Sequence, residues 1–171
     1  MISQKMQDAL NDQVAYEFYS AHIYLSMSAF LESIDLPGLA NWMRIQYQEE
    51  VSHAEKLFDY IIERDGRVVP TNWEAPPKEW KSALQAFEDA LAHEQKVTAR
   101  FNGHMDLAIA EKDHASQIFL QWFVNEQVEE ETSVDKVARE LKMAENAPGA
   151  MLMIDRELGQ RVFTPPAPQG E

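Results

Sequence analysis

Residues 66–81 have the sequence GRVVPTNWEAPPKEWK, and this proline-rich stretch decides how the rest of the chain can fold. The segments on either side of it run for almost 30 residues with hardly any glycine or proline, which predicts long helices there. An extended stretch of about 16 residues spans about 50 Å, whereas a 28-residue helix is about 42 Å long. The stretch can therefore run the length of the molecule and make the helices before and after it parallel.

Five helices are predicted along the chain. They cover, in order, residues 4–34, 38–65, 82–110, 113–144 and 150–161. Ser3 and Asp113 are the expected N-caps, and Gly66 is the expected stop of the second helix. Short turns join the first helix to the second and the third to the fourth, so each pair should be an antiparallel hairpin. The prediction is an all-α fold, a four-helix bundle with one long crossover connection and a short fifth C-terminal helix. Residues 1–163 should form one domain, and residues 164–171 a flexible Pro-rich tail.

Composition narrows the possible functions. The 171 residues include 29 acidic and 15 basic side chains, giving a net charge of −14, and no cysteine. The missing cysteines exclude disulfides, zinc ribbons and cysteine-bound iron–sulfur clusters. The acidic balance disfavours nucleic acid as a partner and favours cations. Because there is no N-terminal signal-like segment and no apolar run near 18 residues, we expect a cytoplasmic protein without membrane contact.

Each long helix carries inward positions at alternating spacings of three and four residues, the pattern of a bundle core. In the third helix these positions are Leu84, Phe87, Leu91, Glu94, Thr98, Phe101 and Met105. The polar inward positions of the four helices include Glu17, Gln46, Glu50, His53, Glu94, Gln127 and Glu130. No lysine or arginine occupies an inward position, so these carboxylates have no obvious charge partner.

The polar positions should meet at one level of the bundle. Residues that face each other across an antiparallel hairpin are symmetric about its turn. The midpoint between Glu17 and Glu50 is about 33.5, and that between Glu94 and Glu130 is about 112, both within predicted turns. Four carboxylates, one imidazole and one amide are therefore expected to converge. The alternative is that these glutamates belong to a solvent-exposed helix face.

Such a group requires positive charge. Each buried, unpaired carboxylate costs several kcal/mol, and total stability is only about 5 to 15 kcal/mol. Two divalent cations would balance the four glutamates, and Glu50-x-x-His53 supplies two ligands from one helix face. Oxygen-rich sites with one imidazole suit Fe(II), Mn(II) or Zn(II).

At this point the sequence resembles the bacterial non-haem ferritins. The resemblance covers about Ser3 to Phe163 and rests on residues 11–17, 47–54 and 125–130 together with Glu94. It implies a ferritin-like bundle, a shell of 24 identical subunits, oxidation of Fe(II) by O₂ or peroxide at a di-iron centre within each bundle, and storage of ferric mineral.

The resemblance also implies roles for individual residues. Glu17, Glu50 and His53 would hold one iron; Glu50, Glu94 and Glu130 would hold the other, with Gln127 nearby. A possible third iron would use Glu49, Glu126 and Glu129, for which a solvated acidic face is the alternative. Tyr24 would donate a hydrogen bond or an electron, unless it only fills the core, and Trp122 is a weaker redox candidate.

Several features separate the chain from neighbouring families. Bacterioferritins have a haem-binding methionine where this chain has Val51, so we expect no haem, and rubrerythrins need cysteines. The remaining histidines, His22, His93, His104 and His114, are expected at the surface or an interface. The fifth helix resembles the one that surrounds the four-fold axis of a ferritin shell, although it could instead cap its own bundle. Two other functions stay open: a di-iron or di-manganese oxidase without storage, and a helical interaction module with a polar layer.

Overall fold

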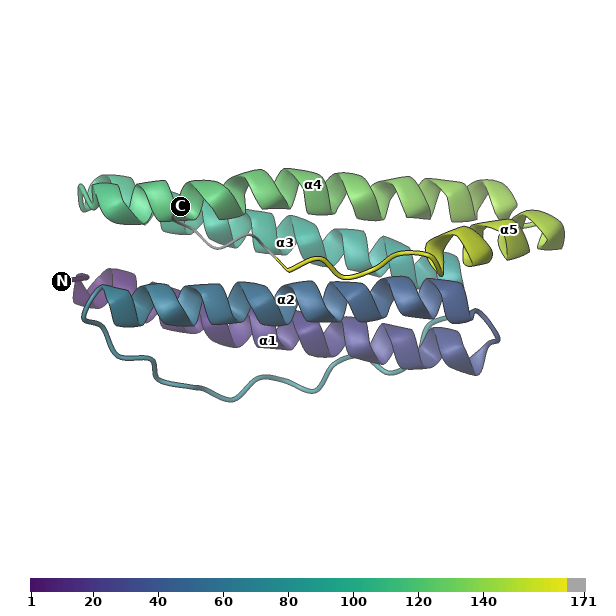
Figure 1. Cartoon of the computed structure of the whole chain (residues 1–171), viewed down its shortest axis with the longest axis horizontal. Helices are drawn as coiled ribbons and strands as arrows, with labels where there is room; N and C mark the ends of the chain where they lie inside the picture. Colours follow the sequence, from purple (N-terminus) through teal and green to yellow (C-terminus); the bar gives the residue numbers. More distant parts are fainter. Residues whose placement is uncertain (166–171) are drawn as a thin grey trace.

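The structure, a computed structural model that describes residues 1–165, is a bundle of four long helices with a short fifth helix at one end (Figure 1). The helices are α1 (Gln4–Ser33), α2 (Pro37–Glu63), α3 (Ala83–Ala110), α4 (His114–Ala144) and α5 (Pro148–Leu158). The predicted fold class is confirmed, and the long helices end within two residues of their expected bounds. The predicted tail, residues 164–171, lies mostly outside the described residues.

The crossover connects the two hairpins as the length argument requires. It runs along α1 and α2 to the opposite end of the bundle, so that α2 and α3 are parallel (Figure 1). The Asn11 side chain donates a hydrogen bond to the carbonyl of Arg67 and accepts one from the amide of Val69. Further along, the hydroxyl of Ser26 donates to the carbonyl of Pro77 at 2.5 Å. Both ends of the crossover are therefore tied to α1.

The N-caps agree with the sequence. The Ser3 hydroxyl accepts a hydrogen bond from the amide of Met6, and the Asp113 carboxylate accepts one from the amide of Ser116. These side chains satisfy amides that have no partner within the helix.

The end of α2 differs from the prediction. The residue with positive φ is Asp65 (φ 58°), not Gly66, and the amide of Gly66 donates to the carbonyl of Ile61 at 2.8 Å. Together with the bond from Asp65 to Ile62, this is a Schellman motif. Gly66 follows the left-handed position because the chain turns one residue earlier than expected. The turns after α1 and α3 repeat the motif.

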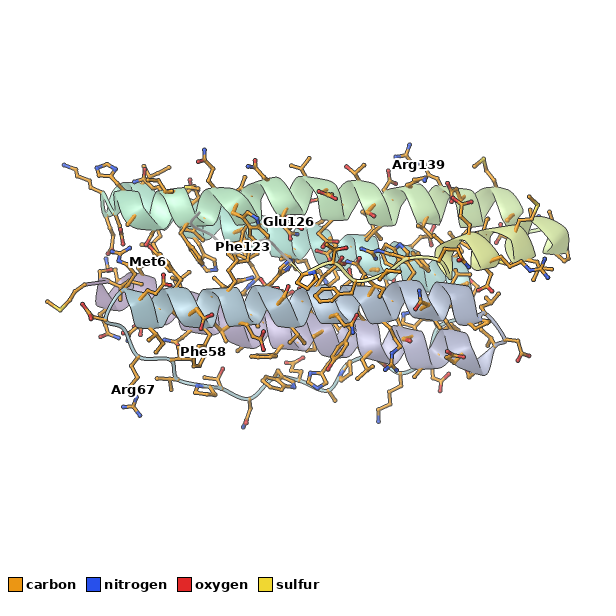
Figure 2. The ribbon with its side chains drawn as sticks, viewed as in Figure 1. Met6, Phe58, Arg67, Phe123, Glu126 and Arg139 are labelled. Atoms are coloured by element: carbon orange, nitrogen blue, oxygen red, sulfur yellow. The ribbon has the colours of Figure 1, made fainter. Side chains whose placement is uncertain are left out.

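Two apolar clusters fill the bundle on either side of a polar layer. One includes Tyr24, Met43 and Phe87, and the other includes Leu57 and Phe123. Figure 2 shows Phe123 and Glu126 on the side of α4 that faces α2 in this view. The two clusters exclude water from both ends of the polar layer, which lowers the dielectric around it.

The buried face of α3 is rotated relative to the prediction. His93, expected at the surface or an interface, is only 6% exposed. Its ring stacks on Tyr16 of α1, and its Nε2 lies 2.7 Å from the Ser20 hydroxyl. Ala90 and Val97 are also buried. Four residues that were expected to point inward are only half-buried: Leu84, Leu91, Thr98 and Met105. The buried face of α3 therefore includes the side that contacts α1 through His93.

The fifth helix packs on its own bundle. The buried Asp155 side chain accepts hydrogen bonds from the amides of Gly38 and Leu39 at 2.8 and 2.9 Å, and so caps the start of α2. None of the helices described here combines the length and apolar character needed to cross a membrane.

Candidate metal centre

Four carboxylates from four helices meet inside the bundle. Glu17 comes from α1, Glu50 from α2, Glu94 from α3 and Glu130 from α4, and each is at most 5% exposed. His53 lies one turn after Glu50 on the same face of α2 and is also buried. The structure thus brings to the interior the five residues that the heptad pattern pointed inward.

Glu17, Glu50 and His53 form the tightest group. Ligand atoms of all three lie within 4.8 Å of one another, and His53 Nδ1 is 3.7 Å from Glu50 Oε2. Oε2 of Glu17 and Oε2 of Glu50 have no hydrogen-bond partner, the only such buried side-chain atoms in residues 1–165. Orphaned buried oxygens are costly, so two of them beside an imidazole fit a cation as the missing partner.

A second group shares the same imidazole. Ligand atoms of His53, Glu126 and Glu130 also lie within 4.8 Å of one another. Glu94 belongs to neither group, and its carboxylate accepts hydrogen bonds from the Tyr24 hydroxyl and from the Gln127 amide. The expected trio of Glu50, Glu94 and Glu130 is therefore not gathered as one cluster, although all three line the same polar layer.

Three glutamine side chains hold three of the carboxylates. Their amide nitrogens donate from Gln13 to Glu17 at 2.8 Å, from Gln46 to Glu130 at 2.6 Å and from Gln127 to Glu94 at 3.0 Å. Glu50, by contrast, receives no such amide. Its carboxylate lies close enough to Glu17, Glu94 and Glu130 to feel all three of them.

Burial and mutual repulsion change the protonation of this layer. Loss of water raises the pKa values of Glu17 and Glu50 well above the usual range. The charge of Glu50 raises the pKa of Glu17 further, and the charge of Glu94 raises that of Glu50 further. The same two causes raise the pKa of Glu130 to about 8. Without a cation the layer therefore retains protons near neutral pH, and a divalent cation would displace them.

The remaining expected ligands lie further out. Glu49 is half-buried and pairs with Arg161, whose Nη2 lies 2.7 Å from its carboxylate. Glu129 is exposed and belongs to neither group. Trp122 contacts His53 edge to face, with 5.4 Å between the ring centroids.

The sequence did not predict the two arginine side chains that support the polar layer from outside. Arg100 donates through Nε to Gln13 Oε1 at 2.8 Å, and Arg161 donates to Gln46 Oε1. The bond from Gln13 to Glu17 spans four residues of one helix, so spacing alone could have suggested it. Arg161 offered no such signal, because it was expected within the last helix and lies beyond the end of α5.

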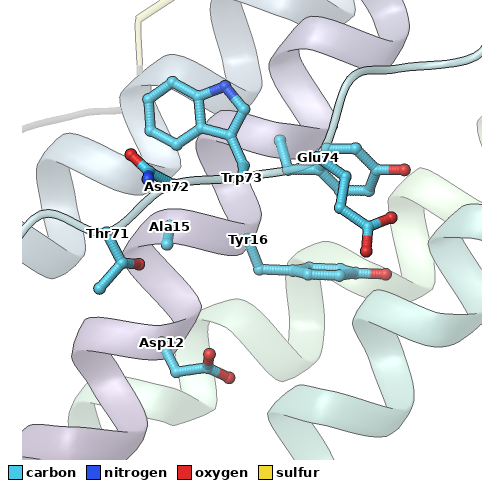
Figure 3. A pocket seen from close by; sticks show the side chains of 8 residues that line it. Asp12, Ala15, Tyr16, Thr71, Asn72, Trp73 and Glu74 are labelled. Atoms are coloured by element: carbon cyan, nitrogen blue, oxygen red, sulfur yellow. The ribbon is translucent and has the colours of Figure 1, made fainter.

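The pocket in Figure 3 lies apart from this centre. Its volume is about 490 Å³, and its lining includes Tyr16 and Tyr19 of α1 and residues 71–74 of the crossover. None of the carboxylates described above contributes to it, so it does not provide a substrate cavity beside the candidate ligands.

Known proteins resemble this chain along almost its whole length. A family model described as "Ferritin-like domain" matches residues 7–144. A bacterial non-heme ferritin from Bacteroides fragilis (strain 638R) is 42% identical over 161 residues, covering 94% of this chain and 100% of the relative. One from Staphylococcus saprophyticus is 40% identical over 163 residues, covering 95% and 98%.

Solved structures give the same result. The chain superposes on an open pore ferritin from the hyperthermophilic archaeon Archaeoglobus fulgidus with a TM-score of 0.94 and 48% identity, covering 95% of this chain and all of that one. An engineered closed form of the Archaeoglobus fulgidus ferritin gives a TM-score of 0.95 at 48% identity, with 96% of this chain and all of the other covered.

Proposed function

We propose, since this chain belongs to the ferritin family, that it oxidises Fe(II) at its intra-bundle carboxylate centre and stores the ferric product inside a multi-subunit shell. Iron is the substrate and cargo of this reaction. Each Fe(II) gives one electron to O₂ or hydrogen peroxide, and the Fe(III) products carry oxygen ligands derived from water or the oxidant.

The observation that carries the proposal is the pair of orphaned oxygens on Glu17 and Glu50 beside His53. These three residues would hold the first iron. Glu50 would be shared with a second iron held by Glu94 and Glu130, with Gln127 nearby, once Glu94 exchanges its hydrogen bonds for the cation. His53, Glu126 and Glu130 offer a further position, and Glu49 and Glu129 lie outside it.

The protein's contribution to the reaction is placement and charge. Gln13 restrains Glu17 through one oxygen and leaves the other free, so the first cation would enter a ligand set already in position, whereas Gln127 holds Glu94 until the second cation replaces that hydrogen bond. Tyr24 donates to Glu94 from within the core and could hold or supply a proton there. The apolar clusters on either side keep water from competing for the cations.

Iron loading tests the proposal. Metal-free protein is given a measured excess of Fe(II) in air, and particle mass, iron per chain and Fe(III) absorbance are followed. We expect a large particle that retains far more than three irons per chain. Glu50→Ala should slow oxidation at least about 100-fold, because it removes a ligand from both irons. Glu88→Ala, which removes one exposed carboxylate of α3, is the matched control.

The outcome separates the alternatives. A small oligomer that holds about two irons per chain would favour a di-iron or di-manganese oxidase without storage. Failure to bind iron, or equal rates for Glu50→Ala and Glu88→Ala, would contradict the proposal and favour a helical bundle with a structural polar layer.

A further inference from the structure

Arg161 connects the C-terminal segment to the metal centre. After α5 the chain turns back and runs along the bundle beside α2 and α4 (Figure 1). There the Arg161 guanidinium lies over the Trp42 ring, 4.7 Å from its centroid. It donates to Gln46 Oε1 and to both carboxylate oxygens of Glu49, at 3.1 and 2.7 Å. One side chain thus holds two residues of α2 that flank the centre.

The contact with Gln46 reaches a candidate ligand. Gln46 is fully buried, and its amide has one oxygen and one nitrogen on opposite sides. Because Arg161 donates to the oxygen, the nitrogen must face Glu130, to which it donates at 2.6 Å. Arg161 therefore fixes the orientation of the amide that restrains Glu130.

The contact with Glu49 removes a carboxylate from the same place. Glu49 precedes Glu50 on α2, and the charges of His53 and Glu126 both act on it. It is nevertheless absent from the group formed by His53, Glu126 and Glu130, and its carboxylate pairs with Arg161 instead. The side chains of Arg161 and Glu49 are 25% and 21% exposed, so their pairing is only partly weakened by water.

We propose that Arg161 is a positioning residue that keeps the outer cation position, formed by His53, Glu126 and Glu130, weak. It withholds Glu49 and restrains Glu130 through Gln46. This inference rests on the proposed function, for which a weak outer position allows iron to move onward.

Anaerobic titration of the metal-free protein with Co(II) tests the inference without turnover. Equilibrium dialysis gives the number and affinity of bound ions, and the visible spectrum reports their coordination. In Arg161→Gln we expect the outer position to bind about tenfold more tightly, because a charged hydrogen-bonded partner of Glu49 is lost and a ligand is freed. Arg161→Lys should return the affinity toward that of the unaltered protein.

Two controls separate this effect from others. Arg139→Gln makes the same change in net charge at an exposed side chain that points away from the bundle (Figure 2), and it should change the outer affinity less than about twofold. Glu49→Gln in the otherwise unaltered protein should leave the outer affinity unchanged, since Arg161 already occupies that carboxylate. When Glu49→Gln is combined with Arg161→Gln, the outer position should lose the tighter binding that Arg161→Gln alone produces.

The results distinguish two failures. Equal affinities in Arg161→Gln and Arg139→Gln, or a weaker outer position in Glu49→Gln alone, would overturn the role of Arg161 while leaving the centre intact. Absence of any tight Co(II) binding to the unaltered protein would instead contradict the proposed function. If Arg161→Gln does not fold, the affinity of the outer position in Glu49→Gln still tests the proposal, because a weaker position would overturn it.

Discussion

Glu130 shows how burial changes the chemistry of a single residue. Its pKa is raised to about 8 by burial and by the charge of Glu94, so the folded protein holds a proton that the unfolded chain releases near pH 4.5. A carboxyl of this kind stabilises the fold below the unfolded pKa, and the stabilisation is lost as pH rises through the folded pKa. The metal-free protein should therefore weaken across neutral pH.

Denaturation between pH 6.5 and 8 tests this expectation. Each carboxyl that is protonated only in the folded state lowers the free energy of unfolding by up to about 1.4 kcal/mol per pH unit. The range begins at pH 6.5 because burial lowers the pKa values of His93 and His104 to about 4. These two histidines therefore lower the stability of the fold only below pH 6.5, where the unfolded chain would protonate them. Glu130→Gln should flatten the pH dependence, whereas the exposed control Glu88→Gln should not. A stability that rises from pH 6.5 to 8 would contradict the assignment.

At this scale the sequence predicted the burial of the candidate ligands better than their hydrogen-bond partners. Glu17 and Glu50 repeat at core spacing, so their burial follows from helix geometry. The donors to these residues follow different rules: Gln13 is a helix neighbour of Glu17, but Arg161 lies more than a hundred residues from Gln46. Its contact depends on how the segment after α5 packs, and no local pattern encodes that packing.

Among the helices, α5 depends on one glycine. A Cβ placed on Gly38 would lie 1.6 Å from the backbone oxygen of Asp155, so no larger residue fits while α5 packs there. Gly38→Ala should displace α5 and lower the free energy of unfolding by about 1–3 kcal/mol. Thermal denaturation measures the loss, and limited proteolysis after residue 145 reports release of the segment.

Gly103→Ala provides the control for the glycine substitution. Gly103 lies within α3, and a Cβ there would meet no atom within 4 Å. Alanine is the better helix former, so this variant should gain about 0.5–1 kcal/mol. Equal melting of Gly38→Ala and the unaltered protein, with α5 still protected, would show that the contact with Asp155 is not needed.

Helix bounds followed from turns and caps, but the orientation of α3 did not. The predicted seam favoured its large apolar residues, such as Leu84 and Leu91. The structure buries Ala86, Ala90 and His93 instead, and His93 contacts Tyr16 and Ser20 of α1. Residue spacing identifies an apolar stripe on each helix. The contacts that the helix makes with its neighbours decide which side of that stripe is most deeply buried.

For the whole molecule, the crossover length was enough to predict the topology. A stretch of about 16 residues can return the chain along the bundle, and the alternation of apolar and polar positions then places the centre. Assembly could not be derived in this way, because the contacts between subunits depend on surfaces that a single chain leaves exposed.

Exposed apolar side chains on α5 lead to a prediction about assembly. Met153 is 73% exposed and Leu152 is 50% exposed, although the same helix is anchored by Asp155. Apolar groups left exposed on a well-anchored helix favour contact with other subunits. A shell of 24 chains of 19.6 kDa would have a mass of about 470 kDa, measurable by light scattering.

Met153→Glu should lower the particle mass without unfolding the bundle, because it places a charge where an apolar contact would form. Helix content by circular dichroism checks the fold of the resulting subunits. Gln160→Glu adds the same charge at an exposed polar position just beyond α5 and should leave the mass unchanged. Subunits separated in this way should still oxidise Fe(II), since every proposed ligand comes from one chain, but they should retain only the few irons of the centre. A full-sized particle in Met153→Glu would mean that α5 faces solvent and that assembly uses other surfaces.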